Sequence, residues 1–456
     1  MPYVNDFARR FAGSAGVELT RLRLGLVTVG STGDVSPILA LSLGLQRAGH
    51  EVRVVAPSWF AATARGLGID FRPLRDFDPQ ALLQSERGRA TFAIRNPIRA
   101  WRAFGAIAEP EARSVLDDAV TACEGVDAVG FSGLGMFPGL VAAAALRVPY
   151  FAAHLVPIGT TADFPSALLP QRPAWLPGYN RASHALARWL VWRTFAPLAS
   201  RARPGGQASS PFPSWAAMLA GARVSLFGIS PAVLPPPETW ASWSRFTGYW
   251  FLDRSGPWQP PPELLDFLAR GPPPVVVGFG SMSGRQPGRT TEVVLEALGR
   301  AGVRGIILSG WGGLESGGLP SSVMSLASAP HEWLFPRAAA AVHHGGAGTT
   351  ASAVRAGVPS VVVPFAFDQP FWGARLRKLG VAPDPIPERR LTPTRLGAAI
   401  RVAVGDARMR RTAQALGERI RAEDGVGVAV KEIELALRRR PAPVAVYRPS
   451  ASPGDW

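Results

Sequence analysis

Residues 343–350, which read His-His-Gly-Gly-Ala-Gly-Thr-Thr, combine residue types that can hold an anion. They follow an apolar predicted strand and open a predicted helix. Backbone amides would therefore point out of the helix N-terminus, where they and the helix dipole suit a diphosphate. Either His343 or His344 could donate to a phosphate oxygen, and the alternative is a glycine-rich structural turn with two incidental histidines. The other residues expected at this anion site are Gly345, Gly346, Ala347, Gly348 and Thr349.

A carboxylate and an amide, Asp368 and Gln369, follow a second predicted strand at residues 360–363. Open α/β sheets bind their ligands at the carboxyl ends of the strands. At that edge the two side chains would offer acceptors and a donor to sugar-type hydroxyl groups. Asp368 could equally be the N-cap of a helix with Pro370 in its first turn, because aspartate is a favoured cap. The residues alone leave these two interpretations level.

A further carboxylate, Asp34, lies in Gly-Ser-Thr-Gly-Asp-Val-Ser-Pro at residues 30–37. It stands between the first predicted strand, residues 22–29, and a helix predicted to have Pro37 at its first position. This places a carboxylate at the ligand edge of the sheet, although a helix cap is geometrically as easy and is favoured by the residues alone. The six histidines and single cysteine show no zinc spacing, so neither a metal site nor an intramolecular disulfide is expected.

The elements that must position these residues form two series of strands and helices. In the first series, residues 22–56 predict a strand–helix–strand unit, and further strands are expected at 126–131, 148–153 and 224–228. The second series begins with a strand at 275–279. Parallel pairing follows from the strand–helix–strand order. The sequence therefore predicts an α/β protein with two Rossmann-like domains facing a cleft.

A proline-rich stretch separates the two series. It contains Pro-Pro-Pro at 235–237, 260–262 and 272–274, and such runs interrupt helices and central strands. The predicted organisation is an N-terminal extension, a first domain, a linker, a second domain and a tail expected to be mobile. These parts span residues 1–21, 22–234, 235–274, 275–438 and 439–456.

The composition excludes several classes of protein. The formal net charge is +16, but only Lys378 and Lys431 among the 49 basic residues are lysines. An arginine bias spread along the whole chain is more typical of GC-rich coding than of a nucleic-acid surface, so no nucleic-acid partner is expected. Neither a signal-peptide core nor a run of eighteen uncharged apolar residues occurs, and the protein is expected to be cytoplasmic.

Five motifs in a fixed order carry a family resemblance. They are Phe-Gly-Ser at 279–281, Trp-Gly-Gly at 311–313, Pro-His-Glu-Trp-Leu-Phe-Pro at 330–336, and the segments at 343–350 and 368–373. In this order they resemble the family 1 glycosyltransferases, in the branch of sterol glucosyltransferases and bacterial macrolide and glycopeptide glycosyltransferases, and are also similar to the broader family 28 domain. The resemblance covers about residues 22–404. It implies the GT-B fold, with the sugar nucleotide held mainly by the C-terminal domain.

The resemblance also implies roles for single residues on the donor side. His343 is the first choice for the contact to the diphosphate, and His344 remains a possible contact. The Asp368–Gln369 pair would hold the hexose hydroxyls, with UDP-glucose as the default donor and a dTDP-deoxysugar as an alternative. The uracil and ribose would lie near residues 331–334. The other donor-side residues implied by the resemblance are His331, Trp333, which could equally be a core residue, Ser281 and Trp311.

By the same resemblance, Asp34 would be the general base of an inverting transfer. It would take the proton of an acceptor hydroxyl while the oxygen attacks the anomeric carbon. UDP would leave with its charge stabilised by the histidine and the helix dipole, without a metal and without a separate cofactor.

Tryptophans point to where the acceptor binds. Eight of the fourteen lie between Trp175 and Trp258. Core packing is the first explanation, and a pocket for a hydrophobic sterol, polyketide, flavonoid or lipid is a close second. Contact of residues 181–203 with an anionic membrane surface is the third. His154, which follows a strand, and Trp372 are weak candidates for the acceptor site.

Three other functions compete with a glycosyltransferase. A UDP-N-acetylglucosamine 2-epimerase of the same fold would need an array of acidic residues in the cleft. A non-catalytic auxiliary protein that binds a sugar nucleotide is disfavoured by the intact polar motifs. A dehydrogenase is disfavoured because the G-x-G-x-x-G spacing is absent. The Asp-x-Asp at residues 76–78 matches a metal motif of another fold and is expected in a solvated loop.

Overall fold

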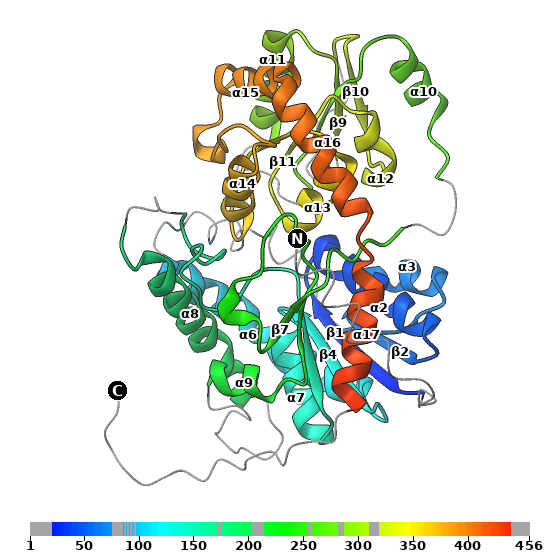
Figure 1. The fold of residues 1–456 in the computed structure, drawn as a ribbon, viewed down its shortest axis with the longest axis vertical. Helices are drawn as coiled ribbons and strands as arrows, with labels where there is room; N and C mark the ends of the chain where they lie inside the picture. Colours follow the sequence, from blue (N-terminus) through cyan, green and yellow to red (C-terminus); the bar gives the residue numbers. More distant parts are fainter. Residues whose placement is uncertain are drawn as a thin grey trace.

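The chain forms two α/β units, each built on a parallel sheet, in a computed structural model (Figure 1). The structure describes residues 21–74, 85, 88, 91, 94, 97–171, 176–201, 214–253, 258–280, 287–309 and 319–438. The predicted fold class, two Rossmann-like α/β domains, is therefore confirmed. The predicted tail at 439–456, the Asp-x-Asp at 76–78 and nearly all of the predicted extension at 1–21 lie outside the described residues.

The first unit contains a seven-stranded sheet in the order β3-β2-β1-β4-β5-β6-β7, with every neighbouring pair parallel. Its strands are β1 (Arg23–Val29), β2 (Glu51–Pro57), β3 (Asp70–Leu74), β4 (Ala128–Gly133), β5 (Tyr150–His154), β6 (Ser225–Phe227) and β7 (Ser244–Phe246). Its helices are α2 (Thr32–Arg47), η1 (Ser58–Phe60), α3 (Ala61–Gly66), α6 (Pro97–Ala122), α7 (Met136–Leu146), α8 (Tyr179–Arg201), α9 (Trp215–Gly221) and η2 (Glu238–Trp240).

The second unit contains a five-stranded sheet in the order β10-β9-β8-β11-β12, also parallel throughout. Its strands are β8 (Val275–Gly278), β9 (Gly305–Leu308), β10 (Val323–Leu326), β11 (Ala340–His343) and β12 (Ser360–Val362). The helices from the linker onward are α10 (Pro262–Ala269), α11 (Pro287–Ala301), α12 (His331–Leu334), η3 (Phe335–Arg337), α13 (Ala347–Ala356), α14 (Gln369–Lys378), η4 (Glu388–Arg390), α15 (Pro393–Gly405), α16 (Ala407–Arg421) and α17 (Gly425–Arg438).

Strand β1 shows how the first sheet is covered on both faces. Leu24 and Leu26 belong to one apolar cluster with α2 and α17, whereas Val27 and Val29 belong to another with α6 and α7. Alternate residues of a strand point to opposite faces, so a strand buried on both sides is apolar almost throughout. This is why the first strand is readable as one continuous apolar run.

The last helix differs from the predicted organisation. The range 275–438 assigned α17 to the second domain, but α17 packs beside α2 of the first unit (Figure 1). Its Val430 and Ile433 join the apolar cluster of α2, and Glu434 lies 3.2 Å from His50 Nε2. An apolar stripe of helical period predicts a helix, but it does not say which sheet that helix covers.

The proline-rich linker also contributes to the first sheet. Residues 235–274 include β7, which pairs with β6 as the edge strand. An edge position is where a proline-flanked strand is tolerated, because one side of it makes no ladder hydrogen bonds. The predicted linker therefore joins the units and also completes the first sheet.

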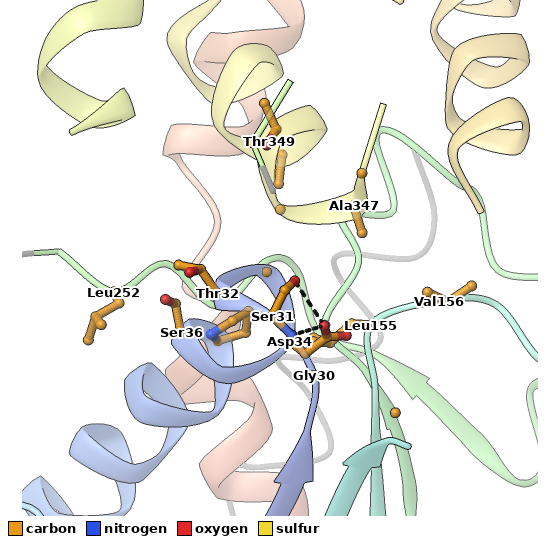
Figure 2. Close-up of a pocket in the computed structure, with 18 of the residues that line it drawn as sticks. Gly30, Ser31, Thr32, Asp34, Ser36, Leu155, Val156, Leu252, Ala347 and Thr349 are labelled. Carbon is orange, nitrogen blue, oxygen red and sulfur yellow. Dashed lines mark hydrogen bonds between the residues drawn. The ribbon is translucent and has the colours of Figure 1, made fainter. Parts of the chain in front are cut away.

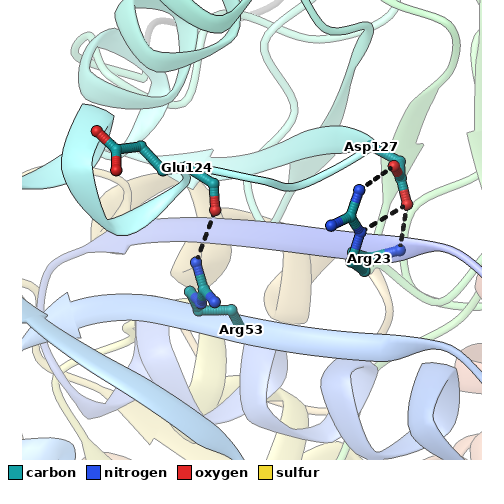
Figure 3. A network of polar contacts seen from close by, with 4 residues as sticks. All are labelled: Arg23, Arg53, Glu124 and Asp127. Atoms are coloured by element: carbon teal, nitrogen blue, oxygen red, sulfur yellow. Dashed lines mark hydrogen bonds and ion pairs between the residues drawn. The ribbon is translucent and has the colours of Figure 1, made fainter.

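The amino edge of the first sheet carries paired charges. The Arg23 guanidinium donates to Asp127 at 3.0 Å, and Arg53 donates to the carbonyl oxygens of Ala122 and Glu124 at 2.8 and 3.1 Å (Figure 3). The side-chain hydrogen bond from Arg23 lowers the pKa of Asp127. These polar groups satisfy one another, so this edge offers no obvious site for a ligand.

Candidate active site

The carboxyl edges of both sheets border one cavity of about 1760 Å³. The loop after β1 and the start of α2 line it from the first unit. The start of α13 and the β12–α14 loop line it from the second unit. This agrees with the rule that parallel sheets bind ligands beyond the carboxyl ends of their strands.

Asp34 lies in the first turn of α2, at the first unit's side of this cavity. The helix begins at Thr32, so Pro37 lies inside it and the predicted start at Pro37 is wrong. Asp34 is consequently not the N-cap: Ser31 occupies that position. Ser31 donates to Asp34 Oδ2 from its backbone N–H at 2.8 Å and from its hydroxyl at 3.1 Å (Figure 2). The reciprocal cap fixes the carboxylate at the cavity wall.

The surroundings of Asp34 raise the pKa of its carboxyl group. Burial raises the pKa, and the two hydrogen bonds from Ser31 oppose that rise. Gly30 makes room for the carboxylate, since its φ is +150° and a Cβ there would lie 2.3 Å from Asp34 Oδ2. Both Ser31 bonds reach Oδ2, which leaves Oδ1 as the oxygen that can receive a proton.

The N-terminus of α13 faces the N-terminus of α2. Gly346 is its N-cap, with no side-chain cap and no acidic residue in the first turn. A Cβ on Gly348 would lie 3.2 Å from Gly33 Cα, so the two helix starts touch. Figure 2 shows Ala347 and Thr349 across from Asp34. Free amides at a helix start, next to a cavity, are suited to anion binding.

The two histidines of the predicted anion site occupy different positions. His343, at the end of β11, is fully buried and does not line the cavity, and its Nδ1 accepts from the Gly345 N–H at 3.1 Å. His344 does line the cavity, and its buried Nδ1 has no hydrogen-bond partner among the described residues. The structure therefore favours His344 over His343 as the ligand contact. Burial lowers the pKa of His344 to about 4, so the ring is neutral near pH 7.

Gly345 supports this arrangement without lining the cavity. Its φ is +89°, and a Cβ would lie 2.6 Å from Val362 Cγ1. Gly346 does line the cavity, and a Cβ there would lie 2.4 Å from His344 Nε2. The glycines are thus required by positive φ at one position and by the close approach of His344 at the other.

The segment after β10 contributes one of its two predicted residues to the cavity. His331 lines the cavity and stacks on Phe335 with centroids 4.4 Å apart, and burial lowers its pKa to about 4. Trp333 does not line the cavity. It packs edge-on against Trp258 at 5.0 Å, and the Arg337 guanidinium lies over its ring at 4.0 Å. Its surroundings therefore favour the core-packing alternative over the donor-site role.

Asp368 and Gln369 both line the cavity, at the start of α14. Gln369 Oε1 accepts from the backbone N–H groups of Phe365 and Ala366 at 2.7 and 3.1 Å. Its amide N–H groups are then the donors that it can present to a ligand. Phe367 has a φ of +55°, a left-handed conformation that is strained for a bulky residue and sharpens this turn.

Trp372 supports Asp368 instead of lining the cavity. Its ring is 1% exposed, and its Nε1–H donates to Asp368 Oδ2 at 2.7 Å. The weak assignment of Trp372 to the acceptor site is therefore corrected to a positioning residue. Burial raises the pKa of Asp368 to about 6, the Trp372 hydrogen bond opposes the rise, and the charge of Asp34 adds to it. The last cause means that the two carboxylates lie close enough to interact.

The remaining donor-side predictions, Ser281 and Trp311, lie outside the described residues. His154, predicted for the acceptor side, lines the cavity at the end of β5. Its Nε2 is buried without a partner among the described residues, and burial lowers its pKa to about 3. It is therefore a neutral polar group facing into the first unit's part of the cavity.

The first unit adds a large apolar wall that the sequence placed only in part. Of the eight clustered tryptophans, Trp215 and Trp250 line the cavity, whereas Trp240 is buried in a cluster of aromatic rings. Trp59 and Trp101 also line it, although they lie well before that cluster in the sequence. Apolar spacing alone cannot separate a residue that packs in the core from one that faces a cavity, and no signal marked these two.

Two negative findings bound the site. Within the ranges that the structure describes, no three His, Cys, Asp or Glu side chains gather in a way that could hold a metal ion. None of the helices in those ranges combines the length and hydropathy that crossing a lipid bilayer requires.

Comparison with known proteins agrees with this geometry. Residues 24–155 match the glycosyltransferase family 28 N-terminal domain, and residues 304–434 match the erythromycin biosynthesis protein CIII-like C-terminal domain. The chain is 38% identical over 421 residues to O-mycaminosyltylonolide 6-deoxyallosyltransferase of Streptomyces fradiae, covering 91% of this chain and 97% of that protein. It is 35% identical over 442 residues to sterol 3-beta-glucosyltransferase of Emericella nidulans, covering 90% of this chain but 30% of that protein.

Solved structures give the same fold. The glycosyltransferase of kitacinnamycin aligns with a TM-score of 0.65 at 21% identity, over 91% of this chain and 99% of that one. Glycosyltransferase VinC, solved in complex with dTDP, aligns with a TM-score of 0.60 at 20% identity, over 91% and 99%. The two sheets and the cavity between them therefore define a two-domain protein of the GT-B class.

Within that class, the chain belongs to the glycosyltransferase family that combines a family 28 N-terminal domain with an erythromycin biosynthesis protein CIII-like C-terminal domain. The predicted family is confirmed. The chain spans about 30% of the length of the sterol glucosyltransferases that it matches.

Proposed function

We propose that the protein transfers a hexose from a sugar nucleotide to a hydroxyl group of a lipophilic acceptor. UDP-glucose is the proposed donor, with a dTDP-deoxysugar as the alternative, and a sterol, polyketide, flavonoid or lipid is the proposed acceptor. The names of the Streptomyces and Emericella relatives support this acceptor class. The apolar wall of the first unit supports it independently, because such a wall suits a large hydrophobic ligand.

In the proposed reaction, Asp34 is the general base. The acceptor hydroxyl gives its proton to Asp34 Oδ1 as its oxygen forms a bond to the anomeric carbon. The bond between that carbon and the diphosphate oxygen breaks, and the configuration inverts in one displacement. The Ser31 hydrogen bonds hold Oδ2, so they fix the direction from which Oδ1 approaches the acceptor. Asp34 then returns the proton to solvent.

The second unit receives the donor in this proposal. The free amides at the start of α13 and the neutral ring of His344 would stabilise the departing diphosphate. Asp368 and the Gln369 amide would hold the hexose hydroxyls, and His331 would lie beside the nucleoside. The proposal assigns the charge of the leaving group to these amides instead of a metal ion. His154 remains a candidate for contact with the acceptor.

One observation carries the proposal: the starts of α2 and α13 touch at Gly33 and Gly348, beside one cavity. A base on the first helix and an anion site on the second are thereby brought within the span of one sugar. An epimerase or a non-catalytic binding protein would have no use for a base placed opposite an apolar wall.

The test is incubation with UDP-glucose or dTDP-glucose and a panel of hydrophobic alcohols, with products read by mass spectrometry. We expect a hexose on at least one alcohol, and a loss of about 10²- to 10⁴-fold in Asp34→Asn. Asp117→Asn is the matched control, because Asp117 is an exposed residue of α6. Equal rates in both variants would remove Asp34 as the base. Activity that survives a chelator would support transfer without a metal.

The protein is also proposed to contact membranes through α8. This helix has no acidic residue, and Leu186 and Trp189 on its outer face are 39% and 47% exposed. The Arg193 guanidinium lies 5.5 Å from the centroid of Trp189. Exposed apolar rings between arginines suit an anionic lipid surface, from which a lipophilic acceptor would be drawn.

A further inference from the structure

Helix α6 presents an almost entirely apolar face to the cavity. The lining positions recur at helical spacing and bring small and branched side chains to the wall at Ala108, Ala112 and Val115. The exception is Glu111, which lines the cavity between them. Glu111 is half-buried, so its carboxylate is partly shielded from water within a row of apolar lining positions.

The cavity wall to which Glu111 belongs also contains large rings. Trp101 meets Phe195 edge-on at 6.3 Å, and Phe137 packs against Phe195 at 5.4 Å. All three rings line the cavity, from α6, α7 and α8. Among the described residues the carboxylate of Glu111 has no hydrogen bond or ion pair, and its backbone oxygen accepts from the Ser114 hydroxyl at 3.0 Å.

The described residues of the first unit place no lysine or arginine on this side of the cavity. Among the described lining residues up to 234, the acidic side chains are Asp34 and Glu111, and no lysine or arginine joins them. His154 is neutral because burial lowers its pKa to about 3. The arginines that line the cavity belong to the second unit, and one of them, Arg355, is already paired with Asp253 at 2.6 Å. The described residues of this wall therefore carry negative charge, although the net charge of the whole chain is +16.

We propose that Glu111 recognises a protonated amine on the acceptor, so that the acceptor is a lipophilic alcohol carrying a basic nitrogen. This inference rests on the proposed function and names the acceptor class within it. The reacting hydroxyl lies at Asp34, the apolar body lies against the rings, and the ammonium pairs with Glu111. An ion pair partly shielded from water, with no lysine or arginine among the described lining residues up to 234, favours the amine over its neutral analogue.

The experiment compares a hydroxysteroid that carries a primary amine with its N-acetyl derivative, which keeps the steroid body but loses the charge. Binding is measured without any donor, by quenching of tryptophan fluorescence and by titration calorimetry on the full chain. We expect the amine to bind roughly five- to tenfold more tightly, the size of one shielded ion pair. Glu111→Gln should remove that preference and leave binding of the N-acetyl derivative unchanged.

Glu109→Gln is the matched control, because Glu109 lies on the same helix, is exposed and does not line the cavity. Equal binding of the two ligands to the unmodified chain, or the same preference in Glu111→Gln as in Glu109→Gln, would overturn the inference. The proposed function fails separately. If the amine binds through Glu111 but no hexose is transferred, only the function is wrong, whereas transfer to neutral alcohols without a role for Glu111 leaves only the inference wrong.

Discussion

The two units line the cavity with different kinds of chemical group. The second unit lines the cavity with a glycine-rich helix start and a sharp turn around Phe367, which carry a few polar side chains such as His344 and Asp368. The first unit meets it with side chains, which come from four or more separate elements. Backbone groups suit the charge and shape that many sugar nucleotides share. Side chains can be exchanged one at a time, which suits a wall that fits different acceptors.

The comparison has one exception, which is Asp34. It lies in the first unit, but a glycine and a reciprocal cap hold it as firmly as the backbone holds the anion site. We therefore expect the contact between α2 and α13 to tolerate substitution poorly and the wall farther away to tolerate it better. The following substitutions test whether that division is real.

The largest effect is expected where the backbone positions the base. Gly30→Ala would put a Cβ 2.3 Å from Asp34 Oδ2 at a φ of +150°, so the carboxylate must move. A displacement of about 1 Å at a reacting group costs roughly 10²-fold in kcat. Gly33→Ala is the neighbouring comparison, because a Cβ there meets nothing closer than 3.8 Å. Steady-state kinetics should show Gly30→Ala far more impaired, and a reversed order would show that Asp34 is not held in this way.

The next effect separates the two histidines. His344→Ala should raise the KM for the donor by about 10- to 100-fold, the value of one hydrogen bond to a charged group. His343→Asn should leave that KM near its original value, because Asn can still accept from the Gly345 N–H and the residue does not line the cavity. Protection by UDP against thermal unfolding gives a second measurement. A larger loss in His343→Asn would restore His343 as the phosphate contact.

Much of the second unit's side of the cavity could be predicted from the sequence, and the reason is physical. A close approach to an anion requires glycines at fixed positions, so the spacing of residues 343–350 predicts a glycine-rich helix start beside a ligand site, and the structure has a helix start there at the cavity. The central strands are visible for a similar reason, since burial on both faces makes them continuously apolar. The edge strands β3, β7 and β10 are only partly buried and were not predicted. The spacing could not predict which histidine ring points toward the cavity, because His343 and His344 are adjacent. Only the fold shows that His344 lines it.

The first unit's wall, which consists of side chains from several elements, was harder to predict. Trp101 and Trp215 are far apart in the sequence, and their helices share one wall only after folding. Trp372 and Trp333 are tryptophans as well, and residue type does not distinguish them from these two. In the structure Trp372 donates a hydrogen bond to Asp368, whereas Trp333 packs against Trp258. Tryptophan is common both in cores and in ligand pockets, so residue type alone does not separate these roles.

A smaller effect should appear in stability. The pKa of Asp368 is raised to about 6 from an ordinary value near 4, so the folded chain binds a proton more tightly than the unfolded chain does. Stability is then lost as pH rises through about 6, and the carboxylate costs about 1–3 kcal/mol above that pH. Asp368→Asn should therefore be more stable than the original chain at pH 8 and not at pH 4.

Denaturant unfolding of both chains at pH 4 and pH 8 measures this difference directly. The asparagine oxygen can still accept from Trp372, so the comparison isolates the charge. Activity should fall even though stability rises, which would mark Asp368 as a residue kept for the ligand and not for the fold. An unchanged stability difference between the two pH values would show that the carboxylate is better solvated than its burial suggests.

The smallest effect tests whether the wall of the first unit continues outward to a lipid surface. Leu186→Ala with Trp189→Ala should weaken binding to phosphatidylglycerol vesicles roughly fivefold, because both side chains are exposed on the outer face of α8. Leu435→Ala on α17 is the matched control, since Leu435 is 37% exposed. Phosphatidylcholine vesicles should bind weakly in every case if the arginines contribute by charge. Equal cosedimentation of the double variant and the control would confine the role of α8 to its inner face, where Val191 and Phe195 line the cavity.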